Sequence, residues 1–436
     1  MSERRARFAV SLAIFTLAGC RDASDPPRIV APNFALGGVG RPSVLVNPNA
    51  NDNGTAKTIQ EGIHDVGDGG KVMIVPGTYA EALVIDKGLT LEAVGGESGP
   101  VIVEPPGAPE IAVRIATNDP VTIRGITVQY TGGAGIRGDG PVDVTIERAT
   151  LLAVDPPLGG TALVSVRRNV VSATQPKRAR LVVRHSMLDG TITDRPAPFP
   201  QIFGVILGTD VDAVLEENVI RRTGGACIFV VMRDDLGGET NVDIVGNDLD
   251  ECHPLARAGS ILLGTLAGVP LPSPTHPVTA TGNVNIVGNT IRNNSRSCLA
   301  TSAIVYEAFT GRIERNRILG VVQPSERPDG TSCATQSPRG LPGAIWVGSL
   351  PARGFPPVSV TVRFNDIEGN AQAGLRVAPN MTGAINATCN WWGSPSGPSG
   401  AGPGTGDAIV VETGAAAPFF TPWATAPIAE TDATSC

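Results

Sequence analysis

The stretch Asn-Val-Asp-Ile-Val-Gly-Asn-Asp-Leu, residues 241–249, returns almost unchanged as Asn-Val-Asn-Ile-Val-Gly-Asn-Thr-Ile at residues 283–291. Weaker copies lie at 211–220, 312–318 and 360–367. Each copy alternates apolar and polar residues over a short run, followed by an Asn and then by an apolar residue two places on. Such repetition is typical of a solenoid, in which one repeat buries its apolar face only by stacking on the next. The recurring asparagines are Asn218, Asn247, Asn289, Asn316 and Asn365.

The repeat predicts β-strands. Its apolar runs are short, rich in Val and Ile, and bounded by Gly, Asn, Asp and Pro, whereas long stretches with helical spacing are nearly absent. Stacked coils lie about 4.8 Å apart, so equivalent residues stand above one another. An inward Asn at the corner after each strand can then bond to the Asn of the next coil and to the backbone of the turn. We therefore assign the asparagines a structural role and no catalytic one.

The composition agrees with a narrow β-solenoid. The chain has 436 residues, with 53 Gly, 37 Pro, 42% hydrophobic and only 4% aromatic residues. Many tight turns account for the Gly and Pro, and a thin core of Val, Ile, Leu and Ala has little room for rings. The net charge of −7 argues against non-specific nucleic-acid binding, which needs a basic face.

Residues 1–20 are expected to be a targeting segment that takes no part in the fold. Arg4, Arg5 and Arg7 form a positive region, and the apolar run at 8–17 is too short to span a bilayer as a permanent helix.

Leu17-Ala18-Gly19-Cys20 resembles the lipobox of bacterial lipoproteins, which implies lipid attachment at Cys20 and membrane contact through that anchor only. An ordinary secretory signal is the alternative. Arg21 follows the Cys, and family analogy then favours the outer membrane. Residues 21–42 are rich in Pro and Gly and predict a flexible tether.

The cysteines beyond the leader predict disulfides, because export places the chain in an oxidising compartment. We favour sequential pairing among several possible connectivities, since about one coil separates the first two cysteines and the last residue could tie the tail down. Six buried free thiols are the alternative. The candidates are Cys227 with Cys252, Cys298 with Cys333, and Cys389 with Cys436.

Residues 43–99 predict an N-terminal cap and the first coils. Thr58 and Glu61 form a capping box for a short helix, with Ile59, Ile63 and Val66 on one face, that ends at Gly69-Gly70 and plugs the open end of the solenoid. Lys-Val-Met-Ile-Val-Pro-Gly-Thr-Tyr-Ala-Glu follows, and then Gly-Leu-Thr-Leu-Glu-Ala. This order resembles right-handed parallel β-helix proteins of the pectin-lyase-like superfamily. The resemblance implies an all-β fold, a single right-handed parallel β-helix that continues through 100–384.

Residues 385–436 predict a C-terminal cap segment. They contain Asn-Trp-Trp-Gly at 390–393 and Phe-Phe-Thr-Pro-Trp at 419–423. The segment resembles the end of periplasmic copper-processing (NosD-like) and other bacterial surface β-helix proteins. We favour a hydrophobic cap, because an open solenoid end must be covered, over an aromatic platform for sugar stacking.

Some coils are expected to carry insertions. The segments 264–282, 321–343 and 351–357 are rich in Pro and Gly and predict loops. In solenoids such loops often build the binding face.

One series of polar residues resembles the catalytic array of polygalacturonases, which use paired Asp residues as general acid and base. Asp210 in Gly-Thr-Asp, then Asp234-Asp235, then His253, then Arg312-Ile313 follow the order of that family's motifs. The flanking residues differ: Gly208 replaces an Asn, His253 lies in Cys-His-Pro, and no Lys follows Ile313. Ordinary turns explain these residues equally well, and on turn chemistry alone that interpretation is favoured.

A calcium-dependent lyase site is less well supported. Two acidic clusters are present, but no second motif completes either of them, and the histidines lack the spacing of a zinc site. No cofactor or metal is therefore predicted. The clusters are Asp248, Asp250 and Glu251, and Asp210, Asp212, Glu216 and Glu217.

Three functions remain open from the sequence. The first is a lipid-anchored cell-envelope protein that binds a polysaccharide or an envelope protein and has no complete catalytic motif. The second is a carbohydrate-active enzyme: a glycoside hydrolase using Asp210, Asp234 and Asp235 or, less favoured, a calcium-dependent polysaccharide lyase. The third is a structural spacer or adhesin.

Overall fold

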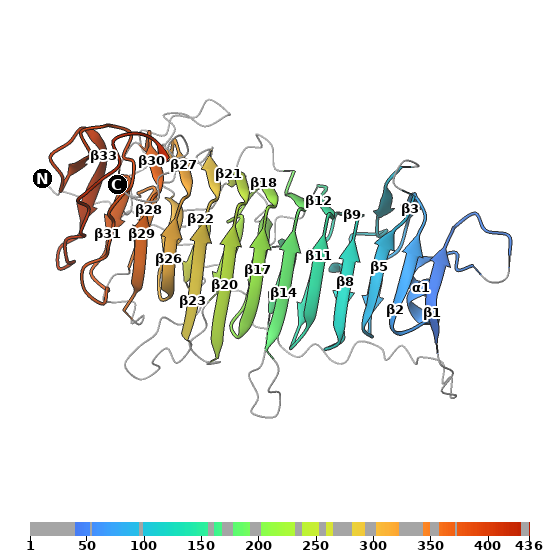
Figure 1. Cartoon of the computed structure of the whole chain (residues 1–436). Coiled ribbons are helices and arrows are strands. Elements are labelled where there is room, and N and C mark those ends of the chain that lie inside the picture. The colour runs from blue at the N-terminus through green and yellow to red at the C-terminus, as the bar shows by residue number, and fades with distance from the viewer. Residues whose placement is uncertain are drawn as a thin grey trace, which may run out of the picture.

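The computed structural model describes residues 40–52, 55–95, 99–155, 161–167, 178–191, 202–231, 238–252, 259–264, 281–292, 302–321, 343–348, 357–370, 373–428 and 436. These residues form three parallel β-sheets around one apolar core, with a single short helix at the N-terminal end. Figure 1 shows the coils side by side along one axis, from β1 at the blue end to β33 at the red end. The chain is a parallel β-helix, as the sequence predicts.

Each coil contributes one strand to each sheet, and all pairings within the three sheets are parallel. Sheet A consists of β1 (Arg41–Val46), β2 (Val66–Ile74), β5 (Leu89–Ala93), β8 (Pro120–Arg124), β11 (Asp143–Glu147), β14 (Ala179–Arg184), β17 (Val211–Glu216), β20 (Glu239–Val245), β23 (Thr281–Val287), β26 (Thr310–Glu314) and β29 (Ser359–Arg363). Sheet B consists of β3 (Gly77–Tyr79), β6 (Val101–Val103), β9 (Ile126–Tyr130), β12 (Thr150–Ala153), β15 (Met187–Asp189), β18 (Val219–Thr223), β21 (Asp248–Cys252), β24 (Thr290–Arg292), β27 (Arg317–Leu319) and β30 (Asp366–Glu368). Sheet C consists of β4 (Leu83–Ile85), β7 (Ile111–Ile115), β10 (Ala134–Asp139), β13 (Thr161–Arg167), β16 (Ile202–Leu207), β19 (Ile228–Val231), β22 (Gly259–Gly264), β25 (Ser302–Tyr306), β28 (Ile345–Val347), β31 (Leu375–Val377), β33 (Gly406–Val411) and β32 (Pro398–Gly400).

The repeated stretch sets the register. In sheet A, β20 pairs with β23 so that Asn241 lies opposite Asn283 and Ile244 opposite Ile286. Alternate residues of each strand point inward, so apolar side chains stack on one another along the axis. The inward stack of sheet A is Val44, Val72, Leu91, Ile123, Ile146, Val183, Leu215, Ile244, Ile286, Ile313 and Val362, all buried.

A ladder of asparagines holds the corner between sheets A and B. Asn289 Nδ2 donates to Ile244 O at 2.8 Å and to Asn316 Oδ1 at 3.0 Å, and its own Oδ1 accepts from the N–H and Nδ2 of Asn247. The same bonds recur in each of these coils, so every buried amide is satisfied. The predicted ladder is confirmed, and it extends one coil further, to Asn390, where the sequence analysis did not place it. Its members are Asn218, Asn247, Asn289, Asn316, Asn365 and Asn390.

The residue before each ladder position adopts a left-handed backbone. Gly246 has φ +65° and Gly288 has φ +68°, which explains the Gly before the Asn in the two best copies of the repeat. In other coils Glu217, Arg315 and Phe364 adopt the same conformation, at φ 50° to 57°. The corner therefore has a fixed two-residue geometry whatever the side chain at its first position.

The helix α1 (Ile59–Asp65) caps the N-terminal end with the predicted capping box: Glu61 N–H donates to Thr58 Oγ1, and Glu61 Oε2 accepts from Thr58 N–H. Glu81 of the next coil also accepts from the free N–H groups of Ile59 and Gln60, at 2.7 and 3.0 Å. The predicted end of the helix was wrong.

The helix ends at Asp65, and Val66 begins β2, because Val66 pairs with Arg41 of β1 and its N–H donates to Gly62 O. Gly69 and Gly70 accordingly lie inside β2 and not at the end of the helix. None of the described helices has the length and apolar character needed to cross a membrane.

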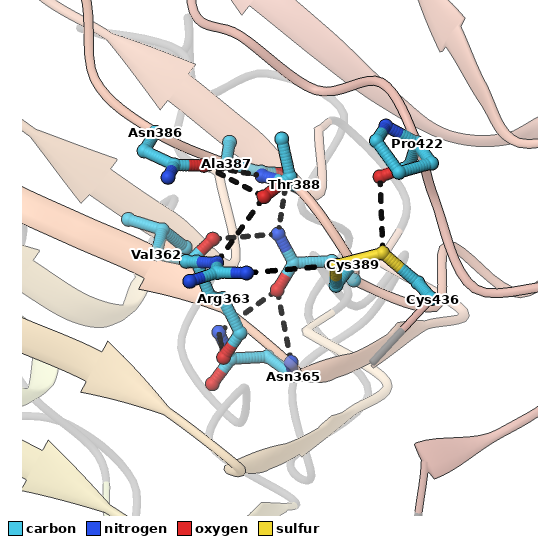
Figure 2. The surroundings of a disulfide bond; sticks show 10 residues. Val362, Arg363, Asn365, Asn386, Ala387, Thr388, Cys389, Pro422 and Cys436 are labelled. Carbon is cyan, nitrogen blue, oxygen red and sulfur yellow. Dashed lines mark hydrogen bonds between the residues drawn. A yellow bond between two sulfur atoms is a disulfide. The ribbon is translucent and has the colours of Figure 1, made fainter. Parts of the chain in front are cut away.

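Two of the predicted disulfides are present. Cys227 and Cys252 join neighbouring coils, and Cys389 joins Cys436, which ties the end of the chain to the last coil (Figure 2). Cys298 and Cys333 lie outside the described residues. The leader, with Cys20, and the tether to residue 39 also lie outside them.

The C-terminal tryptophans close the solenoid. Trp392 is fully buried in the main core, and Trp391 and Trp423 donate their indole N–H groups to Glu368 Oε2 and Pro395 O. Their burial supports the predicted hydrophobic cap.

We predict that Asn289→Ala destabilises the fold by about 3 kcal/mol, because it leaves Ile244 O and the amide groups of Asn247 buried without partners. Urea unfolding followed by circular dichroism measures this. The control is Asn285→Ala, which removes one exposed bond to Asp243 on the outer face and should cost less than about 1 kcal/mol. Equal losses in the two variants would refute the ladder as a source of stability.

Candidate functional site

The connections between strands differ sharply at the three corners. From β11 onward, two residues connect each strand of sheet A to the following strand of sheet B, as Arg315 and Asn316 connect β26 to β27. The longer connections all enter or leave sheet C, including 190–201, 265–280 and 320–344. Insertions in this chain therefore border one sheet on both of its edges. In solenoids such additions mark the binding face, so sheet C is the first place to look for a site.

The outer face of sheet A is occupied by paired charges. Glu147 accepts from Arg124 Nε at 2.9 Å and from Arg184, while Glu92 contacts Lys71 at 2.7 Å and Arg124. The hydrogen bond from Arg184 lowers the pKa of Glu147, and the bond from Lys71 lowers the pKa of Glu92. These charges satisfy one another and leave little on this face to recognise a ligand.

The outer face of sheet B is similar. Asp189 is fully buried and accepts from Arg221 Nε at 2.9 Å and Arg222 Nε at 2.8 Å. These bonds outweigh burial and lower the pKa of Asp189. Further along the same sheet, Arg292 of β24 lies 2.7 Å from Asp248 and 3.6 Å from Asp250 of β21. These two carboxylates of the acidic cluster named above are thus ion-pair partners of an arginine.

The outer face of sheet C is apolar over its central coils. Phe229 stacks on Phe203 with ring centroids 5.6 Å apart, and with Ile206 they form a hydrophobic cluster separate from the main core. A row of outward residues in register continues this apolar face along the axis. Most of the row is buried, with Phe229 0%, Ile206 4% and Val305 8% exposed, while Leu262 and Trp346 are partly exposed. The row is Ile206, Phe229, Leu262, Val305 and Trp346, followed by Arg376.

Trp346 and Arg376 form the C-terminal end of that row. Trp346 is partly buried and donates its indole N–H to Gly348 O at 2.8 Å, which fixes the ring. The Arg376 guanidinium lies 5.9 Å from the ring centroid and is ion-paired with Glu412, and its buried Nε has no hydrogen-bond partner among the described residues. A fixed aromatic ring beside a partly satisfied arginine suits binding of a polar ring with an apolar face, such as a sugar.

A buried carboxylate lies at the same face. Glu307 directly follows Tyr306 of β25 and is only 5% exposed. A Cβ at Gly264 in the previous coil would lie 3.0 Å from Glu307 Oε2, so a side chain there would crowd the carboxylate. Trp346, Glu307 and Arg376 are not predicted from the sequence. Connections of different length separate them in the chain, and only the pairing of β25, β28 and β31 brings them to one face.

Asp210, the first residue of the array resembling polygalacturonases, lies at the corner between sheets C and A. It is 5% exposed, 3.6 Å from Arg178 Nε, and its N–H donates to Thr240 Oγ1. Arg178 also contacts Asp212 at 2.7 Å and Glu239 at 3.4 Å. Asp210 thus belongs to an ion-pair group in which one arginine serves three carboxylates.

The other members of that array are not brought together by the described structure. Asp234, Asp235 and His253 lie outside the described residues. Arg312 lies on the outer face of sheet A and contacts Glu314 at 3.7 Å. Within the described part of the chain no group of three or more His, Cys, Asp or Glu side chains could hold a metal ion, and this includes the two acidic clusters considered for calcium.

The comparisons with known proteins assign this chain to no family. No family model and no curated protein matches the sequence. Among solved structures, a PL6 alginate lyase is 14% identical with a TM-score of 0.44, covering 77% of this chain but less than two thirds of its own, 64%. The A-module of the Azotobacter vinelandii mannuronan C-5 epimerase AlgE4 is 13% identical with a TM-score of 0.40, covering 82% of this chain and 91% of its own. Pectate lyase Pel9A is 12% identical with a TM-score of 0.40, covering 76% and 80%. All three TM-scores are below 0.5, so the parallel β-helix of this chain is established by its own strand pairing.

We predict that the charge pairs of sheet A make the fold sensitive to acid. Because its arginine partners lower the pKa of Glu147 in the folded chain, the stability it contributes is present at neutral pH. That contribution is lost as the pH falls through the depressed folded pKa. Glu147→Gln should therefore flatten the fall of unfolding free energy between about pH 6 and pH 3, as measured by urea unfolding. The control is Glu104→Gln, at an exposed glutamate, and a slope unchanged by Glu147→Gln would contradict the assignment.

Proposed function

We propose that this chain is an exported β-helix protein that binds polysaccharide along the outer face of sheet C. The observation that carries the proposal is the coincidence of two features on one sheet. The long connections border sheet C, and its outer face carries the apolar row that ends in Trp346. Sheets A and B instead present charges that are paired with one another.

The surface matches the chemistry of a sugar polymer. Pyranose rings combine apolar faces with polar edges, and aromatic side chains fixed by a hydrogen bond offer such faces a rigid partner. Trp346 is held in this way by Gly348. Beside it lies the ion pair of Arg376 and Glu412, in which the partly exposed Glu412 carboxylate can accept hydrogen bonds from hydroxyl groups. An extended polymer also suits a surface that repeats every coil, at about 4.8 Å.

The cellular setting remains a proposal from the sequence. A lipid anchor at Cys20 and attachment to the outer membrane are supported by the lipobox resemblance alone. The two disulfides suit an oxidising compartment outside the cytoplasm. An envelope protein as the ligand, and a spacer or adhesin without a ligand, are the outcomes to pursue if no polysaccharide binds.

We predict that Trp346→Ala weakens polysaccharide binding about tenfold, because it removes the one partly exposed aromatic ring of the row in the described part of the chain. Affinity electrophoresis against a panel of neutral and charged polysaccharides measures this. Trp346→Phe should keep most of the affinity. Phe419→Ala is the control, since Phe419 is 66% exposed on the C-terminal cap. Unchanged binding in Trp346→Ala would remove sheet C as the binding face.

The enzyme alternative has one observation in its favour. Asp210 lies at the corner between sheets C and A, and Asp234 and Asp235 follow in the sequence between β19 and β20, outside the described residues. A pair of carboxylates among these three residues could act as acid and base on a glycosidic bond. Calcium-assisted elimination has no such support.

If the chain hydrolyses a polysaccharide of the panel, Asp234→Asn and Asp235→Asn should lower reducing-sugar release at least about a hundredfold, as expected for removal of a general acid or base. Asp212→Asn is the control, because Asp212 shares Arg178 with Asp210 but lies on the outer face of sheet A. Calcium-dependent absorbance from an unsaturated product would point to a lyase instead. The absence of both products would remove the enzyme alternative.

A further inference from the structure

Three arginines and a serine meet on the outer face of sheet C, in coils that precede the apolar row. Arg114 of β7, Arg137 of β10 and Ser165 of β13 are in register on neighbouring strands. Arg167 lies two residues beyond Ser165, on the same face, and is in register with Asp139. We call these four residues the arginine cluster. Neighbouring strands are about 4.8 Å apart, so its guanidinium groups can reach a common ligand.

The positive charge of the arginine cluster is only partly compensated. Arg137 lies 3.2 Å from Glu110 Oε1 and 2.9 Å from Asp139 Oδ2, but Glu110 is 82% exposed and such a pair is weak. Arg114 forms no ion pair with any residue of the described chain. Burial lowers the pKa of Arg167, and the charge of Arg137 lowers it further, against the opposing effect of Asp139. Among the described residues, the three arginines of the cluster are therefore accompanied by only two carboxylates, Glu110 and Asp139.

The arginine cluster also holds hydrogen-bond groups without partners. Ser165 is 2% exposed, and its Oγ has no hydrogen-bond partner among the described residues. The Nε atoms of Arg167 and Arg137 are buried and likewise lack a hydrogen bond within the described part of the chain, Arg137 Nε despite its short distance to Asp139. Buried polar groups without partners are rare and costly, so several on one surface indicate a place where a ligand completes the bonding.

Other arginines on the molecule show what a completed set looks like. On sheet A, Arg124 and Arg184 share Glu147, and on sheet B, Arg221 and Arg222 share Asp189. In those places a buried carboxylate of the chain lies between the two guanidinium groups. In the arginine cluster Ser165 occupies the position facing Arg137. The nearby carboxylate, Asp139, is in register with Arg167 and contacts Arg137, but its side chain is 28% exposed and it is not buried between two guanidinium groups.

We propose that the arginine cluster is a binding site for one oxyanion, a carboxylate or sulfate group carried by the polysaccharide of the proposed function. The inference rests on that function and adds the charge of the ligand to it. The oxyanion accepts hydrogen bonds from Ser165 Oγ and from the Arg167 and Arg137 guanidinium groups, and it neutralises their mutual repulsion. Trp346, the partly exposed aromatic residue of the apolar row, then contacts an uncharged sugar ring further along the same face.

Three polymers with one backbone test the charge: dextran, carboxymethyl dextran and dextran sulfate. Binding of the purified chain to each is measured by affinity electrophoresis or calorimetry. We expect at least one charged polymer to bind more tightly than dextran. Arg167→Gln should weaken that binding about tenfold, and Ser165→Ala should weaken it several-fold. Whichever polymer responds to Arg167→Gln identifies carboxylate or sulfate as the group recognised.

The control is Arg180→Gln, which removes the same charge from sheet A, where Arg180 is 61% exposed and 3.7 Å from Asp143. Equal weakening by Arg167→Gln and Arg180→Gln would overturn the site, because it would show attraction by net charge alone. Thermal unfolding of each variant excludes loss of fold, and Ser165→Ala gives a second test without a change of charge.

The two proposals fail in different ways. If a polysaccharide of the wider panel binds and depends on Trp346 but not on Arg167 or Ser165, the arginine cluster is overturned and the proposed function stands. If no polysaccharide binds, both are overturned.

Discussion

The buried amide ladder at the corner between sheets A and B is the constraint on which the rest of the structure depends. A parallel strand cannot turn back tightly on its neighbour, so each coil must pass through three corners, and at least one must be reproduced accurately for the sheets to stay in register. The ladder does this with one side chain per coil. Each Asn accepts from the amide of the Asn before it and donates to the Asn after it and to the backbone carbonyl inside the previous coil. A slip by one residue would break these bonds and turn the inward Val and Ile residues to solvent.

The sequence contains most of this information in readable form. The repeat at 241–249 and 283–291 predicts the strand, the corner and the neighbouring coil, because each of these depends on residues close together in the chain. The same holds for the capping box of Thr58 and Glu61 and for the pairing of Cys227 with Cys252. The helix end was misjudged because a tertiary contact, the pairing of Val66 with Arg41, decides it. Local turn chemistry at Gly69-Gly70 carries no information about that pairing.

The candidate site could not be predicted in the same way. Trp346 lies beside Val305 and Arg376, and Ser165 beside Arg137, because of pairings between coils whose connections differ greatly in length. Spacing in the sequence therefore does not reveal these neighbours. Motif comparison instead drew attention to Asp210, whose carboxylate shares Arg178 with Asp212 and Glu239. The sequence does show where the insertions lie. They indicate sheet C only when the structure shows that the corner between sheets A and B is fixed and that the two corners of sheet C vary in length.

The fixed two-residue corner also has a consequence for how this molecule could change in evolution. Each coil presents the same ladder donors and acceptors to the coil before and the coil after, so a duplicated coil can be inserted, or one removed, without a new kind of junction. The length of the molecule can therefore change in steps of about 4.8 Å while the end caps and the remaining coils keep their contacts. The near-identity of 241–249 and 283–291 is the trace that such a duplication would leave. In the proposed function, the number of coils would set how far the protein extends along a polymer, and a few side chains on one face would recognise the chemistry of that polymer.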